Sequence, residues 1–417
     1  MFSDLHVNVK IRLIVDFFQR IINHMVIPFM ALYFSLYYGA GIAGILTLII
    51  ILWGMIAGFY GGYLSDIKGR RPLLLTAELS NIIIFGLLAL INSPWITSPV
   101  GTFILLLLLN TSINIGKPAA DATIIDVSPP KVRKFIYTIK YWLVNLAFAI
   151  GAAVGAFLFK DFFFIVLLIS SFCSICFYLV YYLFVEETMP EKPKQKTSQK
   201  KFVVFKSYKA ILSDEIFLKF LLVSLIIMSL EYQLIYYISV RLANHFESQS
   251  LFKGFFNLDI NGVEMFGILQ AQNTLLVVCF SGLMIKLLRG TSDKTQLYSG
   301  TILFTIGYIL LGYSTSFWLL LISMLVVTVG EMSYFPVKQS LLSVLIDDNN
   351  RTKYMAVYGL HSRGGMVIAS LTLSISAFLP NWIILSFFGF SGVISLYLYY
   401  SILNDNRTQG KLEQLEG

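Results

Sequence analysis

Residues 61–72 of the chain read GGYLSDIKGRRP and lie between two long apolar runs. This short stretch holds three glycines, one acid and three bases. Small residues allow helices in a membrane to approach closely, and glycine allows the backbone to reverse direction. A simple basic loop would account for Arg70 and Arg71, but not for Asp66 and Gly69 at these spacings. The stretch therefore predicts a specific structural element that joins two helices, and not a simple connecting loop.

The composition places the chain in a membrane. Of its 417 residues 57% are hydrophobic and only 13% are charged, with a mean hydropathy of +0.76. A soluble protein needs about a quarter of its residues charged, whereas apolar runs of about 20 residues, enough for one helical crossing, recur along this chain. The first run contains Asp16, Arg20 and His24, and no small-residue cleavage site follows it. We therefore expect it to be a spanning helix and not a signal peptide.

Twelve spans are predicted, six on each side of a polar, lysine-rich segment. We expect an all-α polytopic membrane protein with 12 transmembrane helices in two pseudo-symmetric six-helix bundles. The bundles are expected at 1–190 and 215–417, the second with a short cytoplasmic tail, and a cytoplasmic linker at 191–214. The predicted spans are, roughly, 11–36, 41–64, 73–92, 100–126, 134–158, 162–185, 216–243, 262–288, 296–314, 317–346, 352–378 and 381–403.

The two halves carry a trace of internal duplication. Pro118 precedes Arg133 by the same number of residues as Pro336 precedes Arg351, and each pair brackets the cytoplasmic end of a predicted span, the fourth and the tenth. Matched positions in a six-plus-six arrangement indicate parallel repeats, an architecture that transporters use.

The distribution of bases gives the orientation. With a cytoplasmic N-terminus, Lys160, Arg241 and Lys253 are the bases in predicted extracellular loops, and most others lie in cytoplasmic loops and termini. Cytoplasmic loops of membrane proteins are rich in Lys and Arg. We therefore expect both termini in the cytoplasm and the chain in the cell membrane. The net charge of +8 then reports topology and contact with membrane lipids, and predicts no nucleic-acid partner.

The opening stretch resembles the signature G-x-x-x-D-x-x-G-R-R/K of the major facilitator superfamily. The resemblance implies the fold of that superfamily, alternating access and a charge clasp between the two halves on the cytoplasmic side, tight when the site faces outward. The matching second-half loop, GLMIKLLRGTSDK, keeps a glycine and bases but no acid. The residues that match this gating motif are Gly62, Asp66, Gly69, Arg70 and Arg71. A further cytoplasmic acid and base, Asp126 and Arg133, match proton-coupled exporters and are assigned to the same gate.

The segments DATIIDVSPPKVRKFIYTIKYWL and GEMSYFPVKQSL resemble drug:H+ antiporters of the superfamily. That resemblance implies a role for Glu331 in substrate binding and proton coupling, and export as the direction. Two positions depart from the pattern, because Lys140 and Ile235 stand where acids are expected. Glu231, about one turn before Ile235, is the candidate to replace the second acid.

Ionisable groups inside spans are expensive, so each is a candidate for function. Asp16 and Arg20 share one helix face, as do Lys117 and Asp121, and either pair could simply neutralise itself. Lys140 lacks an acid one turn away, so its partner must lie on another helix or on the substrate. The candidates for substrate binding and proton coupling are Glu331, Lys140, Glu231, Arg20, Asp16, Lys117, Asp121, Arg363 and His361.

These bases predict a substrate with a carboxylate or phosphate, or a zwitterion such as a peptide or metallophore, exported in exchange for protons. A multidrug-like compound, a lipid flippase and an importer on the same fold stay open. The chain contains no HExxH, GxSxG or Walker A motif, so we expect neither an enzyme nor ATP as the energy source. We expect no cofactor, no metal site and a monomer. The long connection between the seventh and eighth spans is expected to be a solvated loop.

Overall fold

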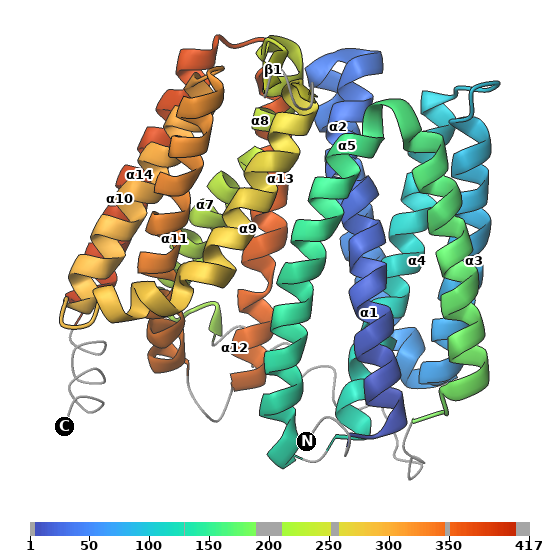
Figure 1. Ribbon diagram of the computed structural model, residues 1–417. Coiled ribbons are helices and arrows are strands. Elements are labelled where there is room, and N and C mark those ends of the chain that lie inside the picture. The colour runs from blue at the N-terminus through green and yellow to red at the C-terminus, as the bar shows by residue number, and fades with distance from the viewer. Residues whose placement is uncertain (1–4, 129, 189–210, 252–257, 347–350, 406–417) are drawn as a thin grey trace. The chain divides into compact units, whose positions relative to one another are not determined.

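The computed structural model describes residues 5–128, 130–188, 211–251, 258–346 and 351–405 (Figure 1). Helices dominate the described residues. The first half of the chain contains α1 (Val7–Val26), the 3-10 helix η1 (Ile27–Phe29), α2 (Met30–Lys68), α3 (Arg70–Ile91), α4 (Pro99–Asp126) and α5 (Pro130–Phe184). The second half contains α7 (Glu215–Glu231), η2 (Tyr232–Leu234), α8 (Tyr237–His245), α9 (Gly262–Leu287), α10 (Asp293–Tyr313), α11 (Phe317–Leu345), α12 (Arg351–Tyr358), α13 (Leu360–Ile375) and α14 (Asn381–Leu403).

Every predicted span coincides with helix. In the described residues eight helical stretches are long and apolar enough to cross a membrane. Two of these stretches hold two crossings each, because the helical backbone breaks at Gly39, where φ is 77°, and at Phe162. Figure 1 shows α5 turning back on itself and running down beside α3. The helix α10 and the pair α12–α13 supply the remaining two crossings, so the prediction of an all-α polytopic membrane protein is confirmed.

The helices group into two compact units. The first comprises residues 1–192 and 249–274, and the second comprises 193–248 and 275–417. In the first unit α1 packs on α5, and α3 packs on both α4 and α5. In the second unit α10 packs on α11 and α14, and α7 packs on α13 and α14. The predicted linker at 191–214 falls largely on residues outside the described ones, so that boundary stays a prediction.

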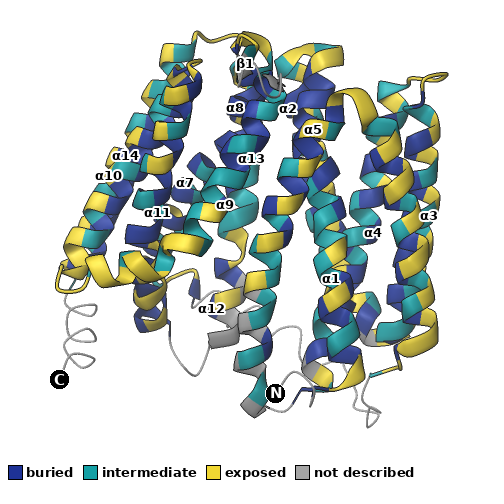
Figure 2. Ribbon diagram, viewed as in Figure 1, coloured by how far each residue is buried: buried dark blue, intermediate teal, exposed yellow. Residues whose placement is uncertain are grey.

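Exposure is patterned as a lipid solvent requires. Large apolar side chains such as Phe59, Phe172 and Trp318 are more than 60% exposed on the outer helix faces. Figure 2 shows exposed and buried residues alternating along the same helices. Polar side chains that are buried, among them Glu78, Asn81 and Lys338, lie on the inner faces. Because lipid tails satisfy no hydrogen bonds, charged groups gather where other protein groups can contact them.

The connection before α9 differs from the prediction. We expected a solvated loop, whereas strands β1 (Gln249–Leu251) and β2 (Leu258–Ile260) form an antiparallel ribbon. Gln249 pairs with Ile260 and Leu251 pairs with Leu258. Backbone pairing satisfies N–H and C=O groups that would otherwise need water. Each strand is only three residues long, too short for an alternating pattern to stand out in the sequence.

Candidate functional site

The opening motif forms a sharp joint between α2 and α3. The helix α2 ends at Lys68, and Gly69 precedes α3 with φ 94° and ψ 169°. L-residues with a side chain rarely adopt a positive φ, which glycine tolerates. A second glycine of the stretch 61–72, Gly61, lies so close to α4 that an added Cβ would be 2.5 Å from the Cα of Ile115. Gly62, by contrast, makes no such close approach, because a Cβ there would meet no atom within 4 Å.

Arg70 connects three helix ends at this joint. Its Nε lies 3.2 Å from Asp126 Oδ2 at the end of α4, and its Nη1 donates to the carbonyl of Ser65, 2.6 Å away. Arg71 donates from its guanidinium to the carbonyl of Tyr182 at 2.8 Å. The structure thus brings together two predicted gating residues, Arg70 and Asp126. The side chains of the other two predicted charges, Asp66 and Arg133, lie outside the described part.

Sequence reasoning missed Glu187, which caps α3. Its Oε1 accepts from the backbone N–H of Arg70 at 2.9 Å, and its Oε2 accepts from that of Arg71 at 3.1 Å. The first N–H groups of a helix have no partner inside it, and a carboxylate also interacts favourably with the helix dipole there. The sequence shows only an acidic pair after the sixth predicted span. It does not indicate which helix end Glu187 contacts.

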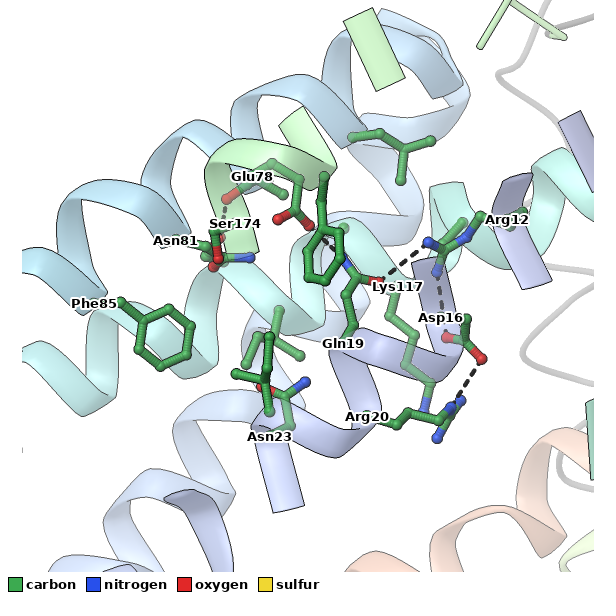
Figure 3. A pocket seen from close by; sticks show the side chains of 18 residues that line it. Arg12, Asp16, Gln19, Arg20, Asn23, Glu78, Asn81, Phe85, Lys117 and Ser174 are labelled. Atoms are coloured by element: carbon green, nitrogen blue, oxygen red, sulfur yellow. Dashed lines mark hydrogen bonds and ion pairs between the residues drawn. The ribbon is translucent and has the colours of Figure 1, made fainter. Parts of the chain in front are cut away.

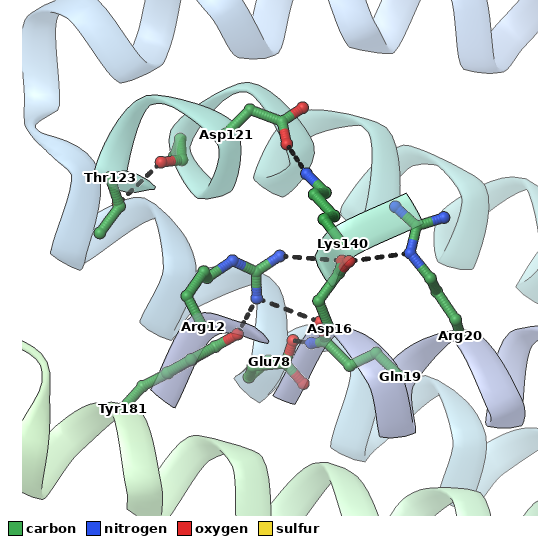
Figure 4. A network of polar contacts seen from close by, with 10 residues as sticks. Arg12, Asp16, Gln19, Arg20, Glu78, Asp121, Thr123, Lys140 and Tyr181 are labelled. Atoms are coloured by element: carbon green, nitrogen blue, oxygen red, sulfur yellow. Dashed lines mark hydrogen bonds and ion pairs between the residues drawn. The ribbon is translucent and has the colours of Figure 1, made fainter. Parts of the chain in front are cut away.

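A charge network crosses the first unit (Figure 4). Asp16 lies between two bases of α1, with Oδ2 2.8 Å from Arg20 Nε and Oδ1 3.4 Å from Arg12 Nη2. Arg12, buried and missed by sequence reasoning, also donates to the hydroxyl of Tyr181 and to Gln19 Oε1. The self-neutralising pair of Asp16 and Arg20 therefore forms, but as one part of a larger network.

Lys140 finds its acid on another helix. Its Nζ lies 2.7 Å from Asp121 Oδ1, which joins α5 to α4. We had kept open a pair between Asp121 and Lys117, one turn before it on α4. Asp121 forms an ion pair with Lys140, and Lys117 lines a cavity nearby.

That cavity lies among α1, α3, α4 and the second half of α5, and its volume is about 180 Å³ (Figure 3). Its lining includes Asp16 and Arg20 from α1 and Glu78 and Asn81 from α3. Glu78 is 4% exposed, and its Oε1 accepts a hydrogen bond from the side-chain amide of Gln19. We missed Glu78, although a carboxylate inside the predicted span 73–92 was a sufficient signal.

The second unit has its own acidic cluster. Glu231 at the end of α7 interacts electrostatically with Glu331 and Lys338, both on α11. Lys338 is 3% exposed and was missed, although it stands inside a predicted span. The hydroxyl of Tyr308 donates to the backbone carbonyl of Glu231 at 3.2 Å. The two acids proposed for coupling, Glu231 and Glu331, thus interact electrostatically with one another, and Glu231 also interacts with a lysine.

The remaining candidates lie on α13. The ring of His361 stacks on Tyr358 with centroids 4.2 Å apart, and His361 also interacts electrostatically with Lys338. Arg363 interacts electrostatically with Tyr232, whose hydroxyl lies 2.8 Å from the hydroxyl of Ser362. His361 is therefore connected to the acidic cluster, and Arg363 to the tyrosine that follows α7.

The profile of the Major Facilitator Superfamily matches residues 13–370. The chain belongs to this superfamily. It is 30% identical over 420 residues to the Na(+), Li(+), K(+)/H(+) antiporter of Planococcus maritimus, covering 97% of this chain and 98% of that protein. It is 28% identical over 140 residues to the MFS-type transporter YqjV of Bacillus subtilis (strain 168), a third of each chain.

Solved structures share the fold at low sequence identity. An auto-inhibited peptide transporter of the POT family superposes with a TM-score of 0.72 at 12% identity, covering 96% of this chain and 97% of that one. The nucleoside transporter NupG superposes with a TM-score of 0.71 at 12% identity, covering 95% and 99%. The superfamily match and the full-length relative identify the protein as a multi-pass membrane protein and a secondary transporter, not an enzyme.

Proposed function

We propose that the protein exports a monovalent metal cation in exchange for protons, at the cluster of Glu231, Glu331 and Lys338. The electrostatic interaction between the two carboxylates carries the proposal. Two negative charges that interact in a low-dielectric interior are costly unless a proton, a cation or a base compensates them. One lysine compensates one acid. A proton or a metal cation can compensate the other, and the two ions then compete for the same site.

Competition at one site produces exchange. A carboxylate that has bound a proton cannot hold a metal cation, so each half of the transport cycle carries a different ion across the membrane. The relative from Planococcus maritimus, named for this exchange and aligned over nearly its whole length, supports the same assignment. We place the termini in the cytoplasm and the chain in the cell membrane as a monomer, and we expect the joint around Arg70 and Asp126 to open and close with each cycle.

A second candidate is proton-coupled export of a carboxylate-bearing or zwitterionic organic molecule. The bases of the first unit favour it, since a cavity rich in Arg and Lys attracts anions. However, Arg12 and Arg20 contact Asp16, and Lys140 contacts Asp121. This compensation leaves less positive charge for a substrate than the sequence alone indicates, so we favour metal cation exchange.

Everted membrane vesicles test the proposal. Respiration acidifies the vesicle interior and quenches an acridine dye, and an antiporter that exchanges added cations for internal protons restores the fluorescence. We expect sodium, lithium or potassium chloride to restore it, choline chloride to have no effect, and Glu331→Gln to abolish the response. Glu215→Gln, at a side chain that is 80% exposed, is the matched control. Normal protein levels with no response to any metal cation would overturn the proposal, and an organic compound retained in the cytosol of a deletion strain would favour the second candidate.

A further inference from the structure

Two buried oxygens in the cavity of the first unit have no hydrogen-bond donor. Glu78 Oε2 and Asn81 Oδ1 are both buried without a partner among the described residues. Both residues are less than 10% exposed and both line the cavity. A buried acceptor without a donor destabilises the folded protein. Such oxygens therefore indicate a water molecule, a proton or a cation that belongs in the cavity.

Two serine hydroxyls in the same cavity can also act only as acceptors toward it. Ser112 Oγ donates its hydrogen to the carbonyl of Ala77 at 2.8 Å, and Ser174 Oγ donates to the carbonyl of Ser170 at 3.0 Å. A hydroxyl has one hydrogen and two lone pairs. With the hydrogen directed at the backbone, the lone pairs remain for a ligand. Both serines are at least 90% buried and line the cavity.

The charges of the cavity are separated into two ends. Figure 3 shows Asp16, Arg20 and Lys117 together, away from Glu78 and Asn81. Asp16 contacts Arg20 and also Arg12, so its charge is compensated at that end. Within the part of the chain that the structure describes, no base lies within 4.0 Å of the Glu78 carboxylate, which interacts with Arg12 only at longer range. The other end of the cavity is therefore a set of oxygens that includes one carboxylate without a base in direct contact.

We propose that this end of the cavity binds a dehydrated or partly dehydrated monovalent metal cation, held by oxygens of Glu78, Asn81, Ser112 and Ser174. Carboxylate, amide and hydroxyl oxygens are the ligands of hard metal cations. A single carboxylate neutralises a single positive charge, whereas a divalent ion would leave a net charge in a low-dielectric site. The cavity volume of about 180 Å³ admits the ion with several waters, each of which occupies about 30 Å³ in the liquid.

This site is separate from the acidic cluster of the second unit, and the choice of ion rests on the proposed cation exchange. Gln19 connects the site to the charge network, because its amide donates to Glu78 while its oxygen accepts from Arg12. An ion bound at Glu78 competes with Gln19 for the carboxylate and so acts on Arg12 and Asp16.

Calorimetric titration of the purified full chain with sodium chloride tests the site, at ionic strength held constant with choline chloride. The Glu331→Gln background removes the cluster of the second unit. In that background we expect sodium binding to persist, to weaken at least tenfold on adding Glu78→Gln, and to weaken severalfold on adding Ser174→Ala. Adding Glu215→Gln, at the exposed start of α7, should leave the affinity unchanged. Size-exclusion profiles identify variants that do not fold. If Glu78→Gln does not fold, Ser174→Ala still tests the site.

The outcomes separate this site from the proposed function. Equal sodium affinity with and without Glu78→Gln and Ser174→Ala, or no binding in the Glu331→Gln background, would overturn the site and leave the vesicle result standing. A wild-type protein that binds sodium through Glu78, yet exchanges no cation for protons in vesicles, would retain the site and overturn the proposed function.

Discussion

Lys140 Nζ on α5 lies 2.7 Å from Asp121 Oδ1 on α4. Both residues are candidates for substrate binding, and the sequence alone allowed Lys140 to face the substrate as an uncompensated base. The ion pair gives Lys140 a structural partner, and the Lys140 side chain is only 17% exposed, against 45% for Asp121. The role of Lys140 therefore depends on whether its charge acts on Asp121 or on a ligand.

The pair can be tested by exchanging its charges. If Lys140 acts on Asp121, Lys140→Ala should slow cation-driven dequenching roughly two- to fivefold, in keeping with about 0.5–1 kcal/mol for a partly exposed ion pair. Adding Asp121→Asn should then recover part of the rate, and the swap Lys140→Asp with Asp121→Lys should recover more. Equal loss in Lys140→Ala, the double neutral variant and the swap would show that Lys140 acts on the substrate, and would favour an organic anion.

Glu187 should stabilise the start of α3. Its carboxylate accepts the backbone N–H groups of Arg70 and Arg71, and a side-chain cap of this kind contributes about 1 kcal/mol. Glu187→Gln should therefore lower the midpoint of thermal unfolding of the purified protein. Glu186→Gln, one residue earlier and also exposed, is the matched control. Equal midpoints for the two variants would contradict a capping role.

Gly69 and Gly62 should respond differently to alanine. Gly69 has φ 94°, and a Cβ there would lie 2.5 Å from Glu187 Oε2. Gly69→Ala therefore strains the backbone by about 1–2 kcal/mol and displaces the cap, and we expect less folded protein and slower exchange. Gly62→Ala meets open space and should behave as the wild type. Fluorescence size-exclusion measures the amount of folded protein, and dequenching measures the exchange rate. Identical behaviour of the two variants would contradict this expectation.

Asp66 is predicted to control turnover and not binding. Its motif resembles the gating signature of the superfamily, and the neighbouring Arg70 contacts Asp126 at the end of α4. Asp66→Asn should reduce exchange at least tenfold while sodium affinity and membrane insertion stay near wild-type values. A normal exchange rate in this variant would contradict a gating role for Asp66.

Much of the fold was predictable because lipid leaves a strong pattern in the sequence. Apolar runs located the crossings, and GGYLSDIKGRRP located the joint at Gly69, since a positive φ at the end of a helix selects glycine. The helix break at Gly39 falls between two predicted spans, and the break at Phe162 coincides with the first residue of the predicted span 162–185. The ribbon of β1 and β2 was not predictable, because three-residue strands carry too little periodicity.

The candidate site was predictable only in part. Intramembrane position marked Glu331 and Asp16, but the pairing of Lys140 with Asp121 depends on how two helices are rotated against each other. Spacing along one helix favours partners one turn apart and is silent about neighbours on other helices. Glu78 and Lys338 carried the same intramembrane signal and were overlooked. The capping of α3 by Glu187 could be recognised only from the folded structure.

The exchange at Glu231 and Glu331 is tested most directly by ²²Na⁺ flux from proteoliposomes that contain only the purified protein. With ²²Na⁺ inside and an acidic exterior, the account predicts rapid efflux that stops when a proton ionophore collapses the gradient, and that is lost in Glu331→Gln. Efflux from wild-type liposomes at the same rate with and without the gradient, or undiminished gradient-driven efflux in Glu331→Gln, would contradict it.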